Sequence, residues 1–310
     1  MSKKIIFMGT PLFAVPILKS LYQNGYPISV VYTQPPQKSQ RGQKINKSPV
    51  QGISETLNID YRIPHTLKNN REEFEFLKKL DADLGIVVAY GQIIPSEFLR
   101  LTKKGFINIH GSILPKWRGA APIQRSIMNL DHETGISIMK IAEELDSGPV
   151  CNVYKIKIDQ NDSAKNISEK LSLIAADKIL DNIDDILEDK AKFVDQDHKK
   201  ATYAKKIDKK EGRINWNDKA EKIIGKINGL VPVPGAFFIF KGERYKILKA
   251  EIGNGIGKVG EVISNKLEIA CTNNQSIKVL EIQRQGKNPQ KNGEFMLGSQ
   301  IKKGSILSHV

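Results

Sequence analysis

The sequence predicts an α/β protein, in which a Rossmann-like, open and mostly parallel sheet is followed by a smaller β-rich domain. Three features predict this class. Short apolar runs alternate with helix-like stretches up to residue 129, a helical period spans residues 163–189, and from residue 235 onward short β-like runs are separated by Gly and Asn turns. Alternating strands and helices form a mostly parallel sheet, because the crossover helices cover both of its faces.

The first strand is expected over Ile5–Met8, where an apolar run ends at Gly9. A helix is then expected to run to residue 24, with Thr10 as its cap and Pro11 at its first position. Proline is favoured at that position because the N–H that it lacks would have no partner within the helix. Further strands are predicted over residues 28–33, 84–89 and 106–109, and further helices over 70–80 and 120–129.

A second domain is expected after the polar stretch 190–206. Short β-like runs follow it, over residues 236–240, 245–250, 260–264, 267–271 and 277–283. Such short strands, close together in sequence, predict a small OB-like β-barrel. We therefore expect a catalytic domain over residues 1–189, a linker over 190–206 and an OB-like domain over 207–310.

The composition limits the partners and the location. The 310 residues carry a formal net charge of +14, and residues 207–310 hold 18 basic and 10 acidic side chains, a net charge of +8. Such a surplus favours a polyanionic partner such as nucleic acid or an anionic membrane, and the alternative is a basic surface that only keeps the protein soluble. Cys151 and Cys271 lie far apart, without His at metal-ligand spacing, so neither a disulfide framework nor a metal site is expected. No signal peptide or membrane span is predicted, and we expect a monomer in the cytoplasm.

A long polar segment, residues 34–49, follows the second strand. It contains Lys38, Arg41, Lys44 and Lys47 and no acidic residue. Loops of this length inside a compact domain are usually functional or disordered. The segment is therefore expected either to contact phosphate or to form a surface loop.

The most informative segment is the end of the strand over 106–109. Asn108 and His110 point to the same side of this strand, because side chains alternate along a strand. Polar side chains at an apolar strand end need partners, since burying them unpaired costs on the order of 1–3 kcal/mol. Ligand sites of open α/β sheets lie at the carboxyl ends of the strands, so the location fits a catalytic pair. Taken alone, however, a histidine in such a place is more often a structural residue whose hydrogen bonds are satisfied.

A third candidate, Asp146, lies in the turn Asp146-Ser147-Gly148-Pro149. An aspartate in a turn is ordinary by itself. Beside a histidine, however, a carboxylate orients the imidazole and favours its charged form. Neither Ser nor Cys stands in a nucleophile elbow, which argues against a covalent acyl-enzyme.

Two motifs together carry a resemblance to a known family. They are Asn108-Ile109-His110-Gly111-Ser112-Ile113-Leu114-Pro115 and Leu145-Asp146-Ser147-Gly148, and in combination they resemble the folate-dependent formyltransferases. The resemblance covers nearly the whole chain. It extends to Phe7-Met8-Gly9-Thr10-Pro11, Val87-Val88-Ala89-Tyr90-Gly91, Trp117-Arg118-Gly119-Ala120-Ala121-Pro122, Thr202-Tyr203-Ala204 and Arg213-Ile214-Asn215-Trp216.

The resemblance implies a set of functional residues and two substrates. It implies that Asn108, His110 and Asp146 are catalytic, without a metal. The formyl donor it implies is 10-formyltetrahydrofolate, and the acceptor is the amino group of methionine carried on initiator tRNA. The folate-binding residues it implies are Val88, Tyr90, Gly91, Ser112, Ile113, Leu114 and Pro115. The tRNA-binding residues are expected to be Lys38, Arg41, Lys44, Lys47 and Lys206.

The mechanism that this resemblance implies is direct attack of the amine on the formyl carbon. Asn108 and protonated His110 would donate hydrogen bonds to the oxygen on which charge develops, and Asp146 would relay a proton.

Two alternatives stay open. One is an enzyme of the same fold that formylates a small amine, such as a glycinamide ribonucleotide or an amino sugar, or that hydrolyses formylfolate. The other is a non-catalytic RNA-binding module. The basic second domain favours the tRNA acceptor, because a small amine does not require a surface for phosphate contacts.

Overall fold

The structure is a computed structural model, and it describes residues 3–39 and 44–307. The chain packs as two compact units. The first unit contains Met1–Ala120, Gly135–Ile156 and Ser168–Ala204, and the second contains Ala121–Thr134, Lys157–Ile167 and Lys205–Val310. Over the described ranges, no helix is both long and apolar enough to cross a membrane.

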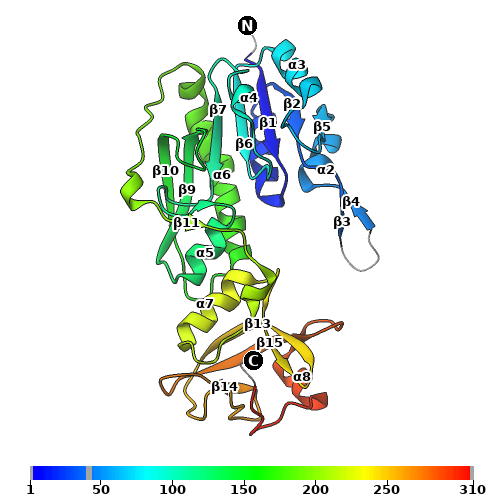
Figure 1. The fold of residues 1–310 in the computed structure, drawn as a ribbon, viewed down its shortest axis with the longest axis vertical. Helices are drawn as coiled ribbons and strands as arrows, with labels where there is room; N and C mark the ends of the chain where they lie inside the picture. Colours follow the sequence, from blue (N-terminus) through cyan, green and yellow to red (C-terminus); the bar gives the residue numbers. More distant parts are fainter. Residues whose placement is uncertain (1–2, 40–43, 308–310) are drawn as a thin grey trace. The chain divides into compact units, whose positions relative to one another are not determined.

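The first unit is built on a seven-stranded sheet with the order β10-β9-β7-β6-β1-β2-β5. From β7 to β5 neighbouring strands are parallel, and β9 runs antiparallel to β7 (Figure 1). The strands are β1 (Ile5–Gly9), β2 (Ile28–Tyr32), β5 (Tyr61–Arg62), β6 (Leu84–Val88), β7 (Phe106–His110), β9 (Glu133–Lys140) and β10 (Val150–Lys157). The mostly parallel α/β fold predicted from the alternating pattern is confirmed.

Burial explains why the central strands read as continuous apolar runs. Every residue of β1 and β6 is buried, as expected for parallel strands that are covered on both faces. The associated helices are α1 (Val15–Gln23), α2 (Pro49–Thr56), α3 (Arg71–Leu80), α4 (Ser96–Leu99) and the long α6 (Ala164–Leu187).

Helix α3 shows how local sequence sets the ends of an element. The Asn70 side chain caps it by accepting a hydrogen bond from the N–H of Glu73, at 3.2 Å. Glu72 and Glu73 stand in the first turn, and lysines stand in the last turn, which complements the helix dipole. The helix expected over 70–80 is therefore found within one residue.

The expected start of the first helix is wrong. Residues Leu12–Ala14 form a short 3-10 turn, η1, and α1 begins only at Val15. The Thr10 hydroxyl is not a cap, because it donates a hydrogen bond to the backbone oxygen of Tyr90, at 2.7 Å. Thr10 therefore joins the chain after β1 to the chain after β6.

The segment 34–49 is more regular than a loop. Residues Gln37–Ser39 (β3) and Lys44–Asn46 (β4) pair as an antiparallel hairpin, which projects from the first unit in Figure 1. Helix α2 then begins at Pro49, where the Ser48 hydroxyl accepts a hydrogen bond from the N–H of Gln51 at 2.9 Å. The sequence did not reveal these strands, because they are short and polar and lack an apolar alternation.

The second unit has an antiparallel sheet of its own. Its strands are β12 (Ala236–Phe240), β13 (Glu243–Gly253), β14 (Glu268–Ala270), β15 (Ser276–Arg284) and β16 (Gln290–Lys291), in the order β12-β13-β15-β14, with β16 beside β15. The buried core cluster of this unit includes Trp216 together with Phe238 of β12 and Tyr245 of β13. Its helices are α5 (Pro122–Met128), α7 (Ala220–Leu230) and α8 (Asn292–Gly298), with a short 3-10 turn, η3 (Lys209–Gly212).

Two glycines allow α7 to lie close to α5. A Cβ atom at Gly225 would lie 2.6 Å from Leu130, and one at Gly229 would lie 2.6 Å from Met128. Because the two glycines are four residues apart, they lie on one face of the helix. This packing places α5 in the second unit.

The strand expected over 260–264 is not formed. Only Glu261 and Val262 make isolated bridges, to Ile306 and Ile269 respectively. The stretch is apolar enough to resemble a strand, but Gly260 has a φ of +80°, which turns the chain just before it.

The stretch expected as a linker is structured through Ala204. It contains a 3-10 turn, η2 (His198–Lys200), and β11 (Tyr203–Ala204), which pairs in parallel with β8 (Arg118–Gly119). These residues belong to the first unit. The division into residues 1–189, 190–206 and 207–310 stays a prediction.

Candidate active site

The candidate active site starts at the carboxyl end of β7. Asn108 and His110 are two residues apart on this strand, and His110 is only 6% exposed. The strand lies between β6 and β9 in the sheet, and the burial of His110 keeps its imidazole largely away from solvent. An imidazole held in such a place needs hydrogen-bond partners.

Asp146 meets both residues from the loop between β9 and β10. The Asn108 side-chain amide donates a hydrogen bond to its Oδ1 atom at 3.3 Å, and Nδ1 of His110 lies 3.6 Å from its Oδ2 atom. The structure thus brings the three predicted catalytic residues into one cluster. Thirty-eight residues separate Asn108 from Asp146, so spacing alone could not establish this contact.

The second ring nitrogen of His110 also faces an oxygen. Its Nε2 atom lies 2.9 Å from the backbone oxygen of Trp117. This contact is within hydrogen-bond distance, whereas the 3.6 Å between Nδ1 and the Asp146 carboxylate is longer than a hydrogen bond. Nδ1 therefore makes the weaker of the two ring contacts.

The motif after β7 supplies a further donor that sequence reasoning missed. The N–H of Gly119 donates to Oδ2 of Asp146 at 2.7 Å, which is the shortest contact of this carboxylate. Trp117, two residues earlier, has a φ of +62°, and its N–H donates to the Thr202 hydroxyl at 2.9 Å. The Trp117-Arg118-Gly119 segment indicated the family but gave no sign of this backbone role.

The predicted folate residues after β7 form a tightly bonded turn. The Ser112 hydroxyl donates to the backbone oxygen of Lys116 at 2.6 Å, and the Ser137 hydroxyl donates to the backbone oxygen of Ser112 at 2.7 Å. The N–H of Leu114 in turn donates to Ser137 at 3.1 Å. Ser112 is fully buried, whereas Ile113 and Pro115 are half-buried.

The predicted folate residues at the end of β6 and just after it have buried side chains or none, so only their backbone groups are available to a ligand. Val88 is fully buried, and the Tyr90 side chain lies in a core cluster. Burial raises the pKa of Tyr90, and within the described ranges its hydroxyl has no hydrogen-bond partner. Gly91 has a φ of +81°, so the chain turns sharply there.

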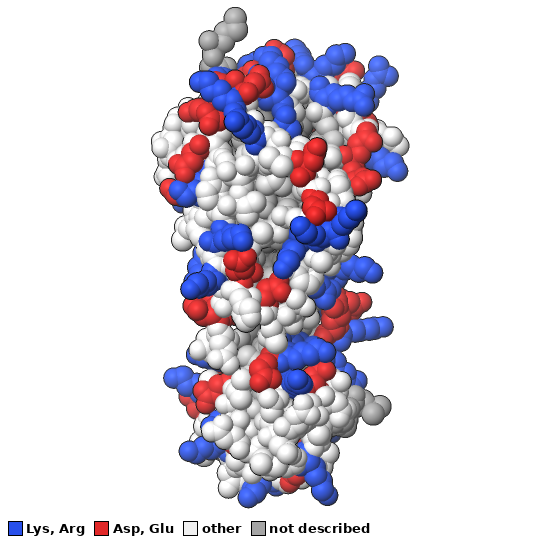
Figure 2. Space-filling model, turned by 90° about the vertical axis from the view of Figure 1, so that its left-hand side faces the viewer, with Lys and Arg blue, Asp and Glu red and all other residues white. Residues whose placement is uncertain are grey.

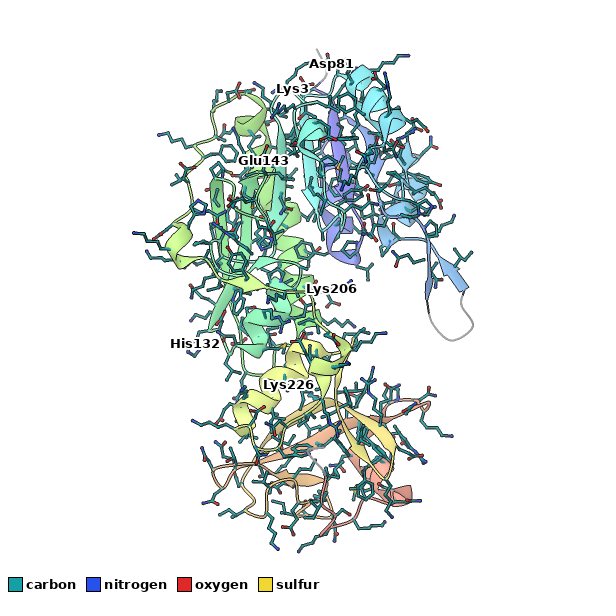
Figure 3. All side chains as sticks on the ribbon, in the orientation of Figure 1. Lys3, Asp81, His132, Glu143, Lys206 and Lys226 are labelled. Atoms are coloured by element: carbon teal, nitrogen blue, oxygen red, sulfur yellow. The ribbon has the colours of Figure 1, made fainter. Side chains whose placement is uncertain are left out.

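The predicted tRNA residues lie on two segments. Lys38 and Lys44 belong to the paired strands of the hairpin, and Arg41 lies outside the described residues. The Lys47 ammonium lies 2.9 Å from the Glu55 carboxylate. Lys206, labelled in Figure 3, is exposed just beyond β11.

Two buried residues near the cluster were not predicted. Arg118 is 2% exposed and Gln196 is 8% exposed, and Arg118 donates to the Gln196 side-chain oxygen through Nε at 3.0 Å and through Nη2 at 2.8 Å. Gln196 stands in a polar stretch that reads as a linker, so no sequence signal marked it. Among the described residues, no group of three or more His, Cys, Asp and Glu side chains could hold a metal ion.

The class of protein follows from this site, the fold and the match to known families. Residues 3–182 match the family described as formyl transferase, and residues 206–300 match the one described as formyl transferase, C-terminal domain. The chain belongs to the formyl transferase family. The resemblance that the two motifs predicted is confirmed.

Particular relatives are similar over the whole chain. The chain is 69% identical to a curated methionyl-tRNA formyltransferase of Pelagibacter ubique over 310 residues, which are 100% of both chains. It is 40% identical to the methionyl-tRNA formyltransferase of Jannaschia sp., over 98% of this chain and 99% of the relative.

Solved structures share the fold at low identity. An N-formyltransferase from Helicobacter canadensis, in complex with folinic acid and dTDP-3-aminofucose, matches with a TM-score of 0.70 and 20% identity, over 90% of this chain and 99% of that chain. HypX from Aquifex aeolicus, in complex with tetrahydrofolic acid, matches with a TM-score of 0.67 and 14% identity, over 100% of this chain and 51% of that chain.

Proposed function

We propose that this chain transfers the formyl group of 10-formyltetrahydrofolate to the amino group of methionine on initiator tRNA. The observation that carries the proposal is the 69% identity to a methionyl-tRNA formyltransferase along the full length of both chains. That identity includes residues 207–310, whose net charge of +8 suits contacts with tRNA phosphates.

The donor set of the cluster fits an N-formyl group. A formyl oxygen that gains negative charge is stabilised by N–H donors placed around it. Asn108 and His110 supply an amide and an imidazole at one strand end, and Asp146 lies within 3.6 Å of both. Bound folate would supply a formyl carbon that the amine can attack and a nitrogen that can leave.

We assign roles to the three residues of the cluster. Asn108 and protonated His110 donate hydrogen bonds to the formyl oxygen, and they thereby lower the barrier to attack. Asp146 keeps the imidazole oriented, accepts a proton from the attacking amine and passes it to the folate nitrogen that leaves. The backbone of residues 88–91 and the turn 112–115 would hold the pterin.

We also propose that the hairpin and the chain around Lys206 contact tRNA phosphates. The residues that would act from the segment 34–49 are Lys38, Arg41, Lys44 and Lys47. The Lys47–Glu55 pair is exposed, so it contributes little to stability and can exchange for a phosphate at small cost. A tRNA acceptor would place the reaction in the cytoplasm. We also propose that the protein acts as a monomer.

An acceptor panel tests the proposal. Labelled 10-formyltetrahydrofolate is incubated with the protein and one acceptor at a time: methionyl initiator tRNA, methionyl elongator tRNA, glycinamide ribonucleotide or an amino-sugar nucleotide. We expect transfer to the initiator tRNA in preference to every other acceptor. Transfer only to a small amine would overturn the acceptor, and transfer to none would overturn the catalytic roles.

A further inference from the structure

Gln196 is connected to the loop that carries Asp146. Its side-chain amide donates to the backbone oxygen of Asp146 at 2.9 Å and to that of Gly148 at 2.7 Å. One side chain therefore fixes two carbonyl groups of a loop that has no regular secondary structure of its own. Glu143, labelled in Figure 3, belongs to the same loop and is exposed.

Arg118 holds Gln196 in this orientation. Its guanidinium donates twice to the side-chain oxygen of Gln196, which leaves the Gln196 amide nitrogen to face the two loop carbonyls. The orientation of the amide is thus determined by its neighbours: the oxygen faces donors and the nitrogen faces acceptors. His198 adds a contact at 3.4 Å from Arg118 to its Nδ1 atom.

The contacts close into a ring around Asp146. Gly119, the residue after Arg118, donates its N–H to the Asp146 carboxylate at 2.7 Å. Arg118 is connected to the same residue indirectly: it donates to the Gln196 side chain, and Gln196 donates to the backbone oxygen of Asp146. The backbone and the side chain of Asp146 are therefore fixed by one dipeptide, directly and through Gln196.

Asp146 needs such support because of its backbone conformation. Its φ is +48°, in the left-handed region that residues other than glycine adopt rarely. A residue in this region keeps its conformation only when its surroundings determine it. The backbone conformation, together with the side-chain torsions, sets the direction of the carboxylate and therefore its distance from His110.

The geometry points to Gln196 as a positioning residue for the transfer reaction, held by Arg118 and acting through Asp146. This inference rests on the proposed function. Gln196 lies in the stretch that the sequence marks only as a polar connection, and it does not touch the reacting groups. Its effect is to keep the Asp146 carboxylate directed at His110 and Asn108.

The test uses Gln196→Glu in the full chain. A glutamate keeps an acceptor for Arg118, but it loses the N–H donors to the Asp146 and Gly148 carbonyls. We expect kcat for methionyl initiator tRNA to fall roughly tenfold to a hundredfold, since small misplacements of a catalytic group have effects of this size. KM for tRNA and for 10-formyltetrahydrofolate should stay near the wild-type values. Asp195→Ala, an exposed neighbour, is the matched control and should behave like the wild type.

A second background separates positioning from general stability. In Asp146→Asn, adding Gln196→Glu should change kcat by less than about twofold, because residues that act as a unit are not additive. If the two effects multiply instead, Gln196 does not act through Asp146 and the inference is wrong. Wild-type kcat for Gln196→Glu would also overturn it.

The remaining outcomes are also decisive. Thermal unfolding reports whether the variants fold. If Gln196→Glu does not fold, Gln196→Met replaces it, because methionine has a similar length and no hydrogen-bond donor. Failure of both to fold would make Gln196 a structural residue and overturn the positioning role. If the wild type itself transfers no formyl group to methionyl-tRNA, both the proposed function and this inference are wrong. If the wild type is active and Gln196→Glu has the same kcat, only the inference is wrong.

Discussion

At the scale of single residues, the chemistry of this site depends on one carboxylate with several donors. Asp146 receives a backbone N–H from Gly119 and an amide N–H from Asn108, and it lies 3.6 Å from the His110 ring. Hydrogen bonds to a charged acceptor are stronger than those between neutral groups. The carboxylate can therefore orient an amide and an imidazole together.

Removing the charge of Asp146 tests this role. In Asp146→Asn the shape is kept, but the carboxylate beside His110 becomes a neutral amide. We expect kcat to fall roughly 100- to 1000-fold, as when a charge-stabilising group is removed from an active site. Steady-state formylation measures it, with Asp195→Asn as the matched exposed control. Activity near that of the wild type would make Asp146 an ordinary turn residue.

The two cysteines give a prediction about pH. Burial raises the pKa of the Cys151 thiol to about 11 and that of Cys271 to about 12. A raised pKa means less thiolate at pH 8, by roughly a hundredfold or more compared with an ordinary thiol. Labelling with a thiol reagent at pH 8 should therefore be slow in the native protein and fast after unfolding in guanidinium. Fast labelling of a native thiol would contradict this.

At the scale of elements, the sequence predicted what depends on apolar pattern and capping. The strands around β1, β6 and β7 and the capped helix α3 are found nearly where expected, because their burial and end signals are local. The hairpin β3–β4 was not predicted, since its strands carry no apolar pattern. Gln196 was not predicted either, because its importance comes from Arg118, 78 residues away in the sequence.

Hydrogen bonds join the base of the hairpin to the turn after β6, and a substitution at Gly91 tests how much they contribute to stability. The Gln34 amide donates to the backbone oxygens of Tyr90 and Gly91, at 3.2 and 2.8 Å. A Cβ atom at Gly91 would lie 2.4 Å from Nε2 of Gln34, so an alanine there would displace that side chain. Gly25 has a similar φ, +78°, but nothing within 4 Å of such a Cβ atom.

We expect Gly25→Ala to lower the free energy of unfolding by about 1 kcal/mol through backbone strain alone. Gly91→Ala should lower it by about 1 kcal/mol more, because hydrogen bonds of Gln34 are also lost. Urea unfolding of both variants measures the difference. Equal destabilisation would show that the contact of Gln34 with this turn contributes nothing.

At the scale of the whole molecule, the positive net charge comes from an excess of basic side chains, and the basic and acidic side chains do not form separate patches on the face drawn in Figure 2. Basic and acidic side chains lie among one another over the face drawn in Figure 2. The surplus is largest for residues 207–310, with 18 basic and 10 acidic side chains. Binding of a polyanion by such a surface weakens as salt rises, because counterions compete for it.

Salt dependence tests the tRNA residues. The affinity for methionyl initiator tRNA should fall steeply with salt, and each of Lys38→Gln, Lys47→Gln and Lys206→Gln should reduce the slope of log affinity against log salt by about 1. Lys79→Gln, an exposed lysine on α3, is the control and should leave the slope unchanged. Filter binding at several salt concentrations provides the slopes. A slope that none of the three variants alters would remove these lysines from the interface.

The central claim is that Asn108 and His110 stabilise the charge that develops during formyl transfer to methionyl-tRNA. Its most direct test is single-turnover transfer with enzyme in excess over methionyl initiator tRNA, because product release does not then limit the rate. We predict that Asn108→Ala and His110→Ala each slow this step roughly 100- to 1000-fold, while His132→Ala, at an exposed histidine labelled in Figure 3, does not. Transfer by either site variant at the wild-type rate would contradict the account.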